Sequence, residues 1–130
     1  MLIFGHRFIN SERLYHIDDV EAVLRTPSNS LVYLSFSEQN LDIIEHLNSN
    51  SVRFALEVEN IRDVIYAENL GASFILLKET LAKSAQKVAE TYLFDAKILV
   101  HIEEESQIET MAYEGIDGVV FANAIVKIST

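Results

Sequence analysis

Residues 54–77, FALEVENIRDVIYAENLGASFILL, decide the fold of this chain. An apolar run over residues 52–58 predicts a strand, and Asn60 is placed to cap a helix that Gly71 ends. A second apolar run, over residues 73–77, follows directly. The helix turns three apolar side chains to one side, namely Ile61, Val64 and Ile65. A strand, an amphipathic helix and another strand, joined this closely, predict a parallel β–α–β unit.

The same alternation extends along the chain and predicts a single α/β domain over residues 1–130. About six mostly parallel strands are expected, at residues 2–9, 31–36, 52–58, 73–77, 97–102 and 118–125. Five helices are expected between them. The first covers residues 17–25 with Asp18 as its cap, the second follows Ser37, and the last ends at Gly115. Residues 10–16 are expected to form a polar connection.

The apolar runs at residues 31–36 and 74–77 are nearly continuous, which is typical of strands that are covered on both faces. We therefore expect an open three-layer sandwich of the flavodoxin-like type, with helices on both faces of the sheet. The alternative is an incomplete β/α barrel. The expected core consists of Leu34, Phe36, Leu56, Ile75, Leu77, Ile98, Val100, Val119 and Phe121.

Composition excludes several classes of partner. Twenty acidic residues against ten basic ones give a net charge of -10, so nucleic acid and anionic membranes are poor partners. The absence of cysteine excludes disulfides and thiolate sites, and it is compatible with a reducing cytoplasm. The first residues show no secretory leader, and no apolar run reaches the length of about 18 residues that a membrane span needs. We expect a cytoplasmic protein.

Motifs of the common α/β enzymes are missing. The four glycines form neither a dinucleotide-binding nor a P-loop pattern, so we expect no nucleotide cofactor. No acidic pair follows the first strand, which argues against a phospho-receiver domain, and no G-x-S-x-G elbow supports a serine hydrolase. No H-x-x-H or H-E-x-x-H pair suggests a metal centre. The residues therefore predict no catalytic group and no metal site.

Polar side chains nevertheless collect where successive strands are expected to end. Residues two apart on a strand face the same way, so Glu57 shares a face with Glu59, and His101 shares one with Glu103. The candidate ligand-binding residues are Glu57, Glu59, Lys78, His101, Glu103 and Asn123. The alternative explanation is that the acidic side chains only interact favourably with the dipoles of the following helices, at a solvated edge of the sheet.

A resemblance to known barrels supports this choice of edge. Residues 55–60, ALEVEN, with the following helix and the strand at 74–77, resemble one βα unit of quinolinate phosphoribosyltransferases. The ending GIDGVVF at 115–121 with AIV at 124–126 resembles the late strands of phosphate-binding β/α barrels. Together these segments cover about half of the chain. The resemblance implies barrel-like strands and a site role for Glu57.

The match departs from those families in two places. Lys78 and Glu79 stand where the phosphoribosyltransferases have Asp-Asn, and Asn123 stands in place of a glycine-rich phosphate loop. The transferase activity is therefore not implied. A full barrel also needs about 200–250 residues. The chain as a whole looks like a small bacterial protein, a resemblance that implies no site residues.

Two functions remain open. The first, which the missing motifs favour, is a non-enzymatic domain that works through self-association or a protein partner. An open sheet leaves edges to cover, so we expect a homo-oligomer, most simply a twofold dimer, with Phe4, Phe8 and Tyr15 as candidate interface residues. The alternative is a binder of a small polar metabolite, or an enzyme, that uses the polar residues at the carboxyl edge. The two differ in whether those residues meet around a concave cavity.

Overall fold

A computed structural model describes residues 1–128. Within that range the chain forms eight strands, five α-helices and two short 3-10 helices. The strands are β1 (Leu2–Phe4), β2 (Leu14–His16), β3 (Leu31–Ser35), β4 (Phe54–Glu57), β5 (Phe74–Leu77), β6 (Lys97–Ile102), β7 (Gly118–Phe121) and β8 (Ile125–Lys127). The helices are α1 (Val20–Val23), η1 (Glu38–Asn40), α2 (Leu41–Ser49), α3 (Ile61–Asn69), α4 (Glu79–Thr91), α5 (Ser106–Tyr113) and η2 (Ala122–Ala124).

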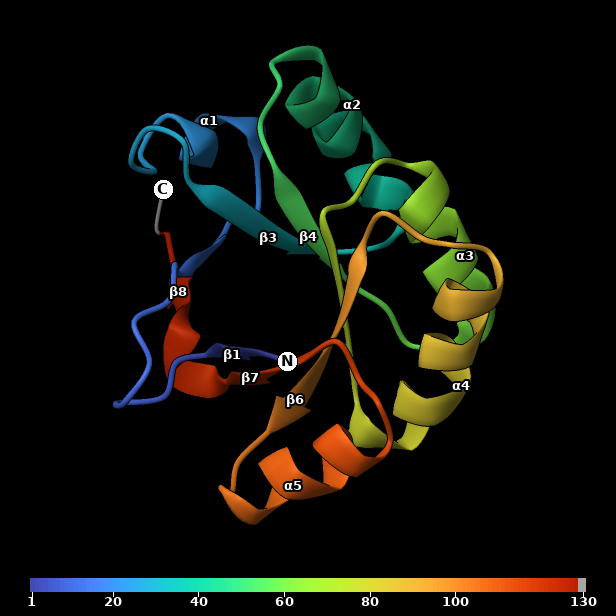
Figure 1. Ribbon diagram of the computed structural model, residues 1–130. Helices are drawn as coiled ribbons and strands as arrows, with labels where there is room; N and C mark the ends of the chain where they lie inside the picture. The colour runs from blue at the N-terminus through green and yellow to red at the C-terminus, as the bar shows by residue number, and fades with distance from the viewer. Residues whose placement is uncertain (129–130) are drawn as a thin grey trace.

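The strands form one parallel sheet in the order β1-β7-β6-β5-β4-β3-β2-β8. Strands β2 to β7 are neighbours in chain order, while β7 and β8 lie near opposite sides of the sheet. Only η2 joins β7 to β8, and so short a segment spans at most about 14 Å. A flat sheet would separate the two strands by six spacings, roughly 29 Å. The sheet therefore curves into an incomplete barrel (Figure 1).

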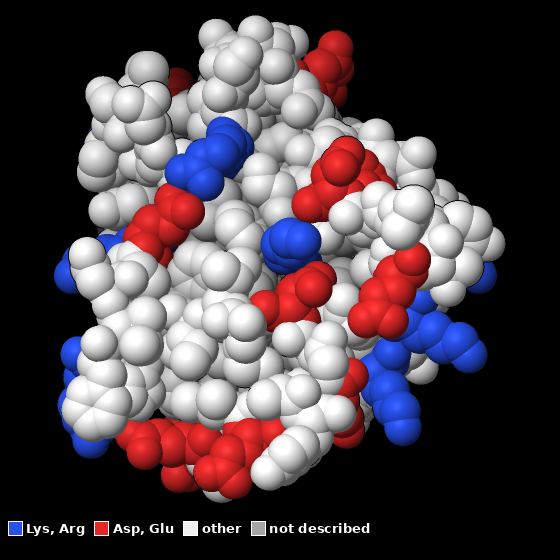
Figure 2. Space-filling view, in the orientation of Figure 1, with Lys and Arg blue, Asp and Glu red and all other residues white. Residues whose placement is uncertain are grey.

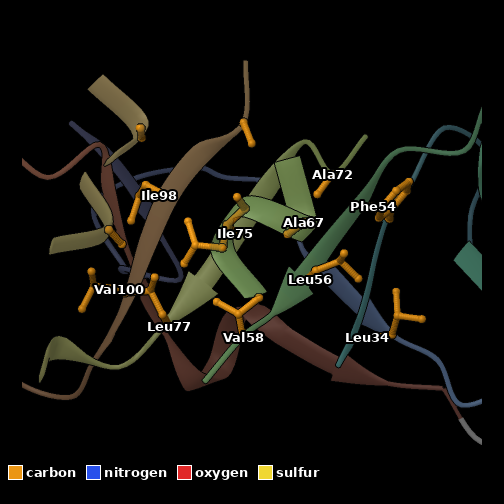
Figure 3. Packing of buried hydrophobic residues seen from close by; sticks show 14 of the residues in the cluster. Leu34, Phe54, Leu56, Val58, Ala67, Ala72, Ile75, Leu77, Ile98 and Val100 are labelled. Atoms are coloured by element: carbon orange, nitrogen blue, oxygen red, sulfur yellow. The ribbon is translucent and has the colours of Figure 1, made fainter. Parts of the chain in front are cut away.

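Two separate hydrophobic clusters cover the two faces of this curved sheet. The outer cluster joins strand residues such as Leu56 and Ile75 to helix residues such as Ala67 of α3 (Figure 3). Within residues 1–128, the inner cluster contains no α-helix residue. Its buried members are Phe4, Leu14, Leu31, Tyr33, Ala55, Leu76, Leu99, Val120 and Ala124. Among residues 1–128 the helices thus cover one face of the sheet, and strand side chains fill the other.

This arrangement confirms a parallel α/β fold, and it fits the incomplete barrel that was the alternative prediction. The prediction of a flavodoxin-like sheet with helices on both faces is wrong, because the strand order is sequential and the inner face packs on itself. The continuous apolar run of residues 31–36 requires only that both faces be covered. A barrel interior does this as well as a second layer of helices.

Residues 1–128 form eight strands where six were predicted. Near the N-terminus, the first strand is shorter than predicted and the predicted connection contains a strand of its own. Near the C-terminus, the last predicted strand is divided in two. The first strand stops at Phe4, since Gly5 adopts a left-handed conformation with φ +88°. The expected connection at residues 10–16 contains β2, which also places Tyr15 on a strand. The last predicted strand is divided by η2 into β7 and β8.

The helices differ less from expectation. The first is reduced to α1, and its cap is Asp19, whose side chain accepts a hydrogen bond from the Ala22 amide at 2.8 Å, rather than Asp18. Asn60 caps α3 as predicted, by accepting from the Asp63 amide at 2.9 Å. Of the predicted core, seven residues are buried, and Phe36 and Phe121 are partly buried. Across residues 1–128, the helices are all too short or too polar to traverse a bilayer.

Candidate functional site

A hollow of about 530 Å³ opens at the carboxyl ends of β4, β5 and β6, beside β3. We call it the mouth hollow. Five of the six predicted ligand-binding residues line it: Glu57, Glu59, Lys78, His101 and Glu103. They meet there because the carboxyl ends of parallel strands lie at one edge of a sheet, and curvature turns that edge into a rim. Tyr33 and Gln107 line the hollow as well.

Glu57 lies at the centre of a hydrogen-bonded triad. Its Oε1 accepts a hydrogen bond from the Tyr33 hydroxyl at 2.8 Å and lies 2.5 Å from His101 Nε2. Three strands, β3, β4 and β6, supply these side chains. The Glu57 side chain is 18% exposed and that of His101 is 31% exposed, so the contact is shielded from water but the imidazole remains reachable. A carboxylate can only accept, so His101 Nε2 carries the hydrogen.

Tyr33 anchors the triad from inside the barrel. It is buried and belongs to the inner cluster. Burial, and then the negative charge of Glu57, raise the pKa of the Tyr33 hydroxyl, which therefore stays protonated and donates. Sequence reasoning missed this residue, because the run at 31–36 looked like pure core. A hydroxyl in an otherwise aliphatic buried strand was the signal that could have identified it.

His16 on β2 packs against Tyr33. The two rings pack edge to face, with centroids 5.0 Å apart. Burial, and next the charge of Lys127, lower the pKa of His16, while Asp18 opposes them. The imidazole of His16 is therefore held neutral at physiological pH. This second histidine also escaped the sequence analysis, which placed it in a connection.

Lys78 contributes a positively charged ammonium group to the mouth hollow. It follows β5 directly and is the N-cap residue of α4, where its side chain makes no capping bond. Four carboxylates share the hollow with it: Glu57, Glu59, Glu79 and Glu103. Lys78 nevertheless forms no ion pair with any residue in the range 1–128. Its ammonium is thus available to a bound molecule.

Gln107 of α5 organises the outer rim. Its side-chain oxygen accepts from the backbone amides of Glu103 and Glu104, both at 2.8 Å. Its side-chain nitrogen donates to Glu79 Oε2 at 2.9 Å. One amide side chain therefore ties the β6–α5 connection to the start of α4. Nothing local in the sequence distinguished Gln107 from other helix-surface residues.

Asn123 lies apart from the other predicted residues. It is part of η2 and lines a neighbouring hollow of about 550 Å³, together with Gly5, His6 and the connection that leads to β2. Glu103 lines both hollows and marks their boundary. The separation follows from the break between β7 and β8, which turns residues 122–124 away from the ends of β4 to β6.

The charges at the mouth are mixed rather than uniform. Figure 2 shows acidic and basic side chains interleaved over one face of the molecule, with acids predominating along its lower edge. Among residues 1–128, no group of three or more histidine, aspartate and glutamate side chains is arranged to hold a metal ion. The arrangement can accept hydrogen bonds, bind an ammonium group, hold an anionic or carbonyl oxygen at Lys78, and accept a proton at an imidazole.

No protein-family model matches the chain, and no curated protein matches its sequence.

Proposed function

We propose that the protein binds a small polar molecule of mixed charge in the mouth hollow. One observation carries the proposal: Glu57, Lys78, His101 and Glu103, predicted from strand ends, all line one concave cavity. A volume of about 530 Å³ lies within the range of roughly 300–1,000 Å³ that small-molecule sites occupy. A solvated sheet edge would instead leave these side chains dispersed.

The chemistry of the walls describes the ligand. The carboxylates at Glu57, Glu59 and Glu103 suit an ammonium group or hydroxyls, while Lys78 suits a carboxylate or carbonyl oxygen. A molecule with both ends, such as an amino acid or a simple derivative of one, satisfies the two sets together. Neither a polyanion nor a nucleotide fits, because four carboxylates surround the single lysine in this hollow. We propose no nucleic-acid partner and no nucleotide cofactor for the same reason.

The cavity favours ligand binding over the association function that the missing motifs suggested. Association depends on other surfaces and is compatible with a ligand site, so the two can be tested separately. The barrel-like strands agree with the resemblance to phosphate-binding β/α barrels, but that resemblance stays a prediction and supplies no substrate.

A thermal-shift and NMR titration with amino acids, amino-acid amides and polyols tests the proposal. Binding to the folded state raises the melting temperature as the ligand concentration exceeds the dissociation constant. We expect at least one compound with both an ammonium and a carbonyl or carboxylate group to shift the wild type. Its effect should be lost in the Lys78→Ala/His101→Ala double variant.

The matched control is Lys83→Ala/His46→Ala, which removes the same two side-chain types from α4 and α2, outside the mouth hollow. This variant should respond to the ligand as the wild type does. Identical responses of the wild type and the Lys78→Ala/His101→Ala variant to every compound would show that the row of polar residues is only a solvated edge.

A further inference from the structure

We propose that the mouth hollow is a hydrolytic site in which His101 acts as general base on small esters or amides of amino-acid type. This inference rests on the proposed ligand class and adds a reaction to it. It uses no residue nucleophile, so the absence of an activated serine or cysteine does not oppose it. The observations that carry it are the Glu57–His101 contact, the accessible second nitrogen of His101, and Lys78 in the same hollow, which forms no ion pair with the described residues.

The protonation of the imidazole follows from its partner. Glu57 accepts the hydrogen on Nε2, so a neutral His101 has its lone pair on Nδ1. Nδ1 has no hydrogen-bond partner among residues 1–128, and that part of the chain contains no buried side-chain nitrogen without a partner. Nδ1 is therefore reachable by solvent. Because His101 lines the mouth hollow, Nδ1 is the ring nitrogen that remains to accept a proton from a bound molecule or an adjacent water.

Glu57 is a positioning residue with an electrostatic effect. Tyr33 holds its Oε1 from below at 2.8 Å, so the carboxylate cannot rotate away without losing a buried hydrogen bond. The carboxylate in turn fixes the ring and stabilises the imidazolium that forms when Nδ1 takes a proton. Glu59 and Glu103 add negative charge around the same hollow.

Lys78 has the complementary role. Water attack on a carbonyl carbon places negative charge on the carbonyl oxygen, and a positioned donor stabilises that charge. Lys78 is the only lysine or arginine among the residues that line this hollow within the described chain, and it is not engaged in an ion pair there. In a ligand whose ammonium group binds the carboxylates, the carbonyl oxygen is the acceptor that remains for Lys78.

The reaction balances without a further reactant. His101 Nδ1 takes a proton from water as the water oxygen bonds to the carbonyl carbon, and the carbonyl π pair moves to the oxygen opposite Lys78. When that pair returns, the bond to the leaving alkoxide or amine breaks, and the imidazolium gives its proton to the leaving group. The products are a carboxylic acid, which ionises in water, and an alcohol or amine.

Glycine methyl ester is the direct probe, with N-acetylglycine methyl ester as its matched partner that lacks the ammonium group. Methanol release is followed by NMR, with buffer hydrolysis subtracted. We expect the wild type to accelerate hydrolysis of the free-amine ester more than that of the acetylated one. His101→Asn should lower the protein-dependent rate by roughly 10²-fold, the usual size of a general-base contribution. Lys78→Met should lower it by on the order of 10²-fold.

Further variants separate positioning from folding. Glu57→Gln should lower kcat and change the pH profile, and Glu57→Asp should restore part of the rate because it returns the carboxylate. His46→Asn, on α2 outside the hollow, should leave the rate unchanged. Circular dichroism confirms that each variant is folded. The protein-dependent rate should vary with pH, as general-base catalysis requires.

The outcomes distinguish this inference from the proposed function. Binding of glycine amide, read by NMR shifts at the hollow, tests the ligand class without requiring turnover. If glycine amide binds but wild type and His101→Asn hydrolyse the ester equally, the hydrolytic role is wrong and the binding function stands. If neither glycine amide nor the ester engages the protein, both proposals are wrong for this ligand class.

Discussion

Gly118 of β7 is the register partner of Leu99 of β6, and the Leu99 side chain occupies the space that a side chain at position 118 would enter. A Cβ added at Gly118 would lie 2.6 Å from Leu99 Cδ2 and 2.9 Å from Leu2 Cβ. Real Cβ atoms essentially never approach another heavy atom outside their own chain neighbours this closely, so something would have to move. Three strands, β1, β7 and β6, can therefore pack closely only because one residue has no side chain.

The first prediction follows from this contact. Gly118→Ala should lower the free energy of unfolding by about 1–3 kcal/mol, the usual cost of overpacking a core. Chemical denaturation measures it, with Ser84→Ala on the exposed face of α4 as a control that adds no buried volume. An unchanged midpoint for Gly118→Ala would contradict the pairing of β1 with β7.

Local periodicity was sufficient to find most of the mouth hollow. Two-residue alternation placed Glu57 with Glu59 and His101 with Glu103, and the rule that parallel strands share a carboxyl edge brought Lys78 between them. That step assumed that these three consecutive strands are neighbours, and β4, β5 and β6 are neighbours in the sheet. The same local reasoning identified Asn60 as the cap of α3.

The remaining features depend on long-range geometry that periodicity does not contain. Tyr33 reaches Glu57 because β3 pairs with β4 in a curved sheet, with Ser35 opposite Glu57. An apolar run is equally consistent with a flat sheet between two helix layers. The break at η2, which separates Asn123 from the site, is a chain reversal across the gap between β7 and β8 that no residue pattern announces.

A second prediction concerns alkaline stability. The pKa of Tyr33 is raised by burial and by Glu57, so above about pH 10 the unfolded tyrosine loses its proton while the folded one keeps it. The folded state then binds more protons, and the free energy of unfolding falls as pH rises. Denaturation of the wild type and Tyr33→Phe between about pH 8 and pH 11 measures this loss of unfolding free energy, because an unfolded tyrosine titrates near pH 10. The wild type should lose more stability over that interval.

Tyr33→Phe removes the hydroxyl, so the part of the stability loss at alkaline pH that this group causes should disappear. At neutral pH the free energy of unfolding should fall by about 0.5–1.5 kcal/mol, because one hydrogen bond is lost. Parallel pH curves for the two proteins would contradict the buried Tyr33–Glu57 contact. Tyr113→Phe, at an exposed position, is the control.

A third prediction concerns stability in acid and depends on His16, whose ring packs against Tyr33. The pKa of His16 is lowered by burial and by Lys127, so as pH falls below about 6.5 the unfolded histidine takes a proton before the folded one does. The unfolded state then binds more protons, and stability is lost as pH falls. Lys127→Met should raise the pKa of His16, because it removes a positive charge and leaves His16 as the remaining partner of Asp18, at 3.8 Å. NMR titration of the imidazole measures the shift, and a lower pKa in that variant would contradict the prediction.

The last prediction is self-association, and the structure changes where it should occur. Phe4 is buried in the inner cluster and cannot form an interface, whereas Phe8 is exposed beside His6 and Arg7. Other large apolar side chains are exposed at the amino end of the barrel, where α4 and α5 end: Tyr92, Leu93 and Tyr113 are 73%, 86% and 89% exposed. Leu93 also adopts a left-handed conformation with φ 52°.

We expect the wild type to form a homodimer through this amino-end surface, in which the exposed apolar side chains of Tyr92, Leu93 and Tyr113 would become buried. Leu93→Asp should shift the mass measured by light scattering from dimer to monomer at matched concentration, whereas Phe8→Ser should leave it unchanged. The mouth hollow lies at the opposite, carboxyl end of the strands, so Leu93→Asp should also bind glycine amide as the wild type does. A wild type that remains monomeric at high concentration would remove the association prediction and leave the ligand site untouched.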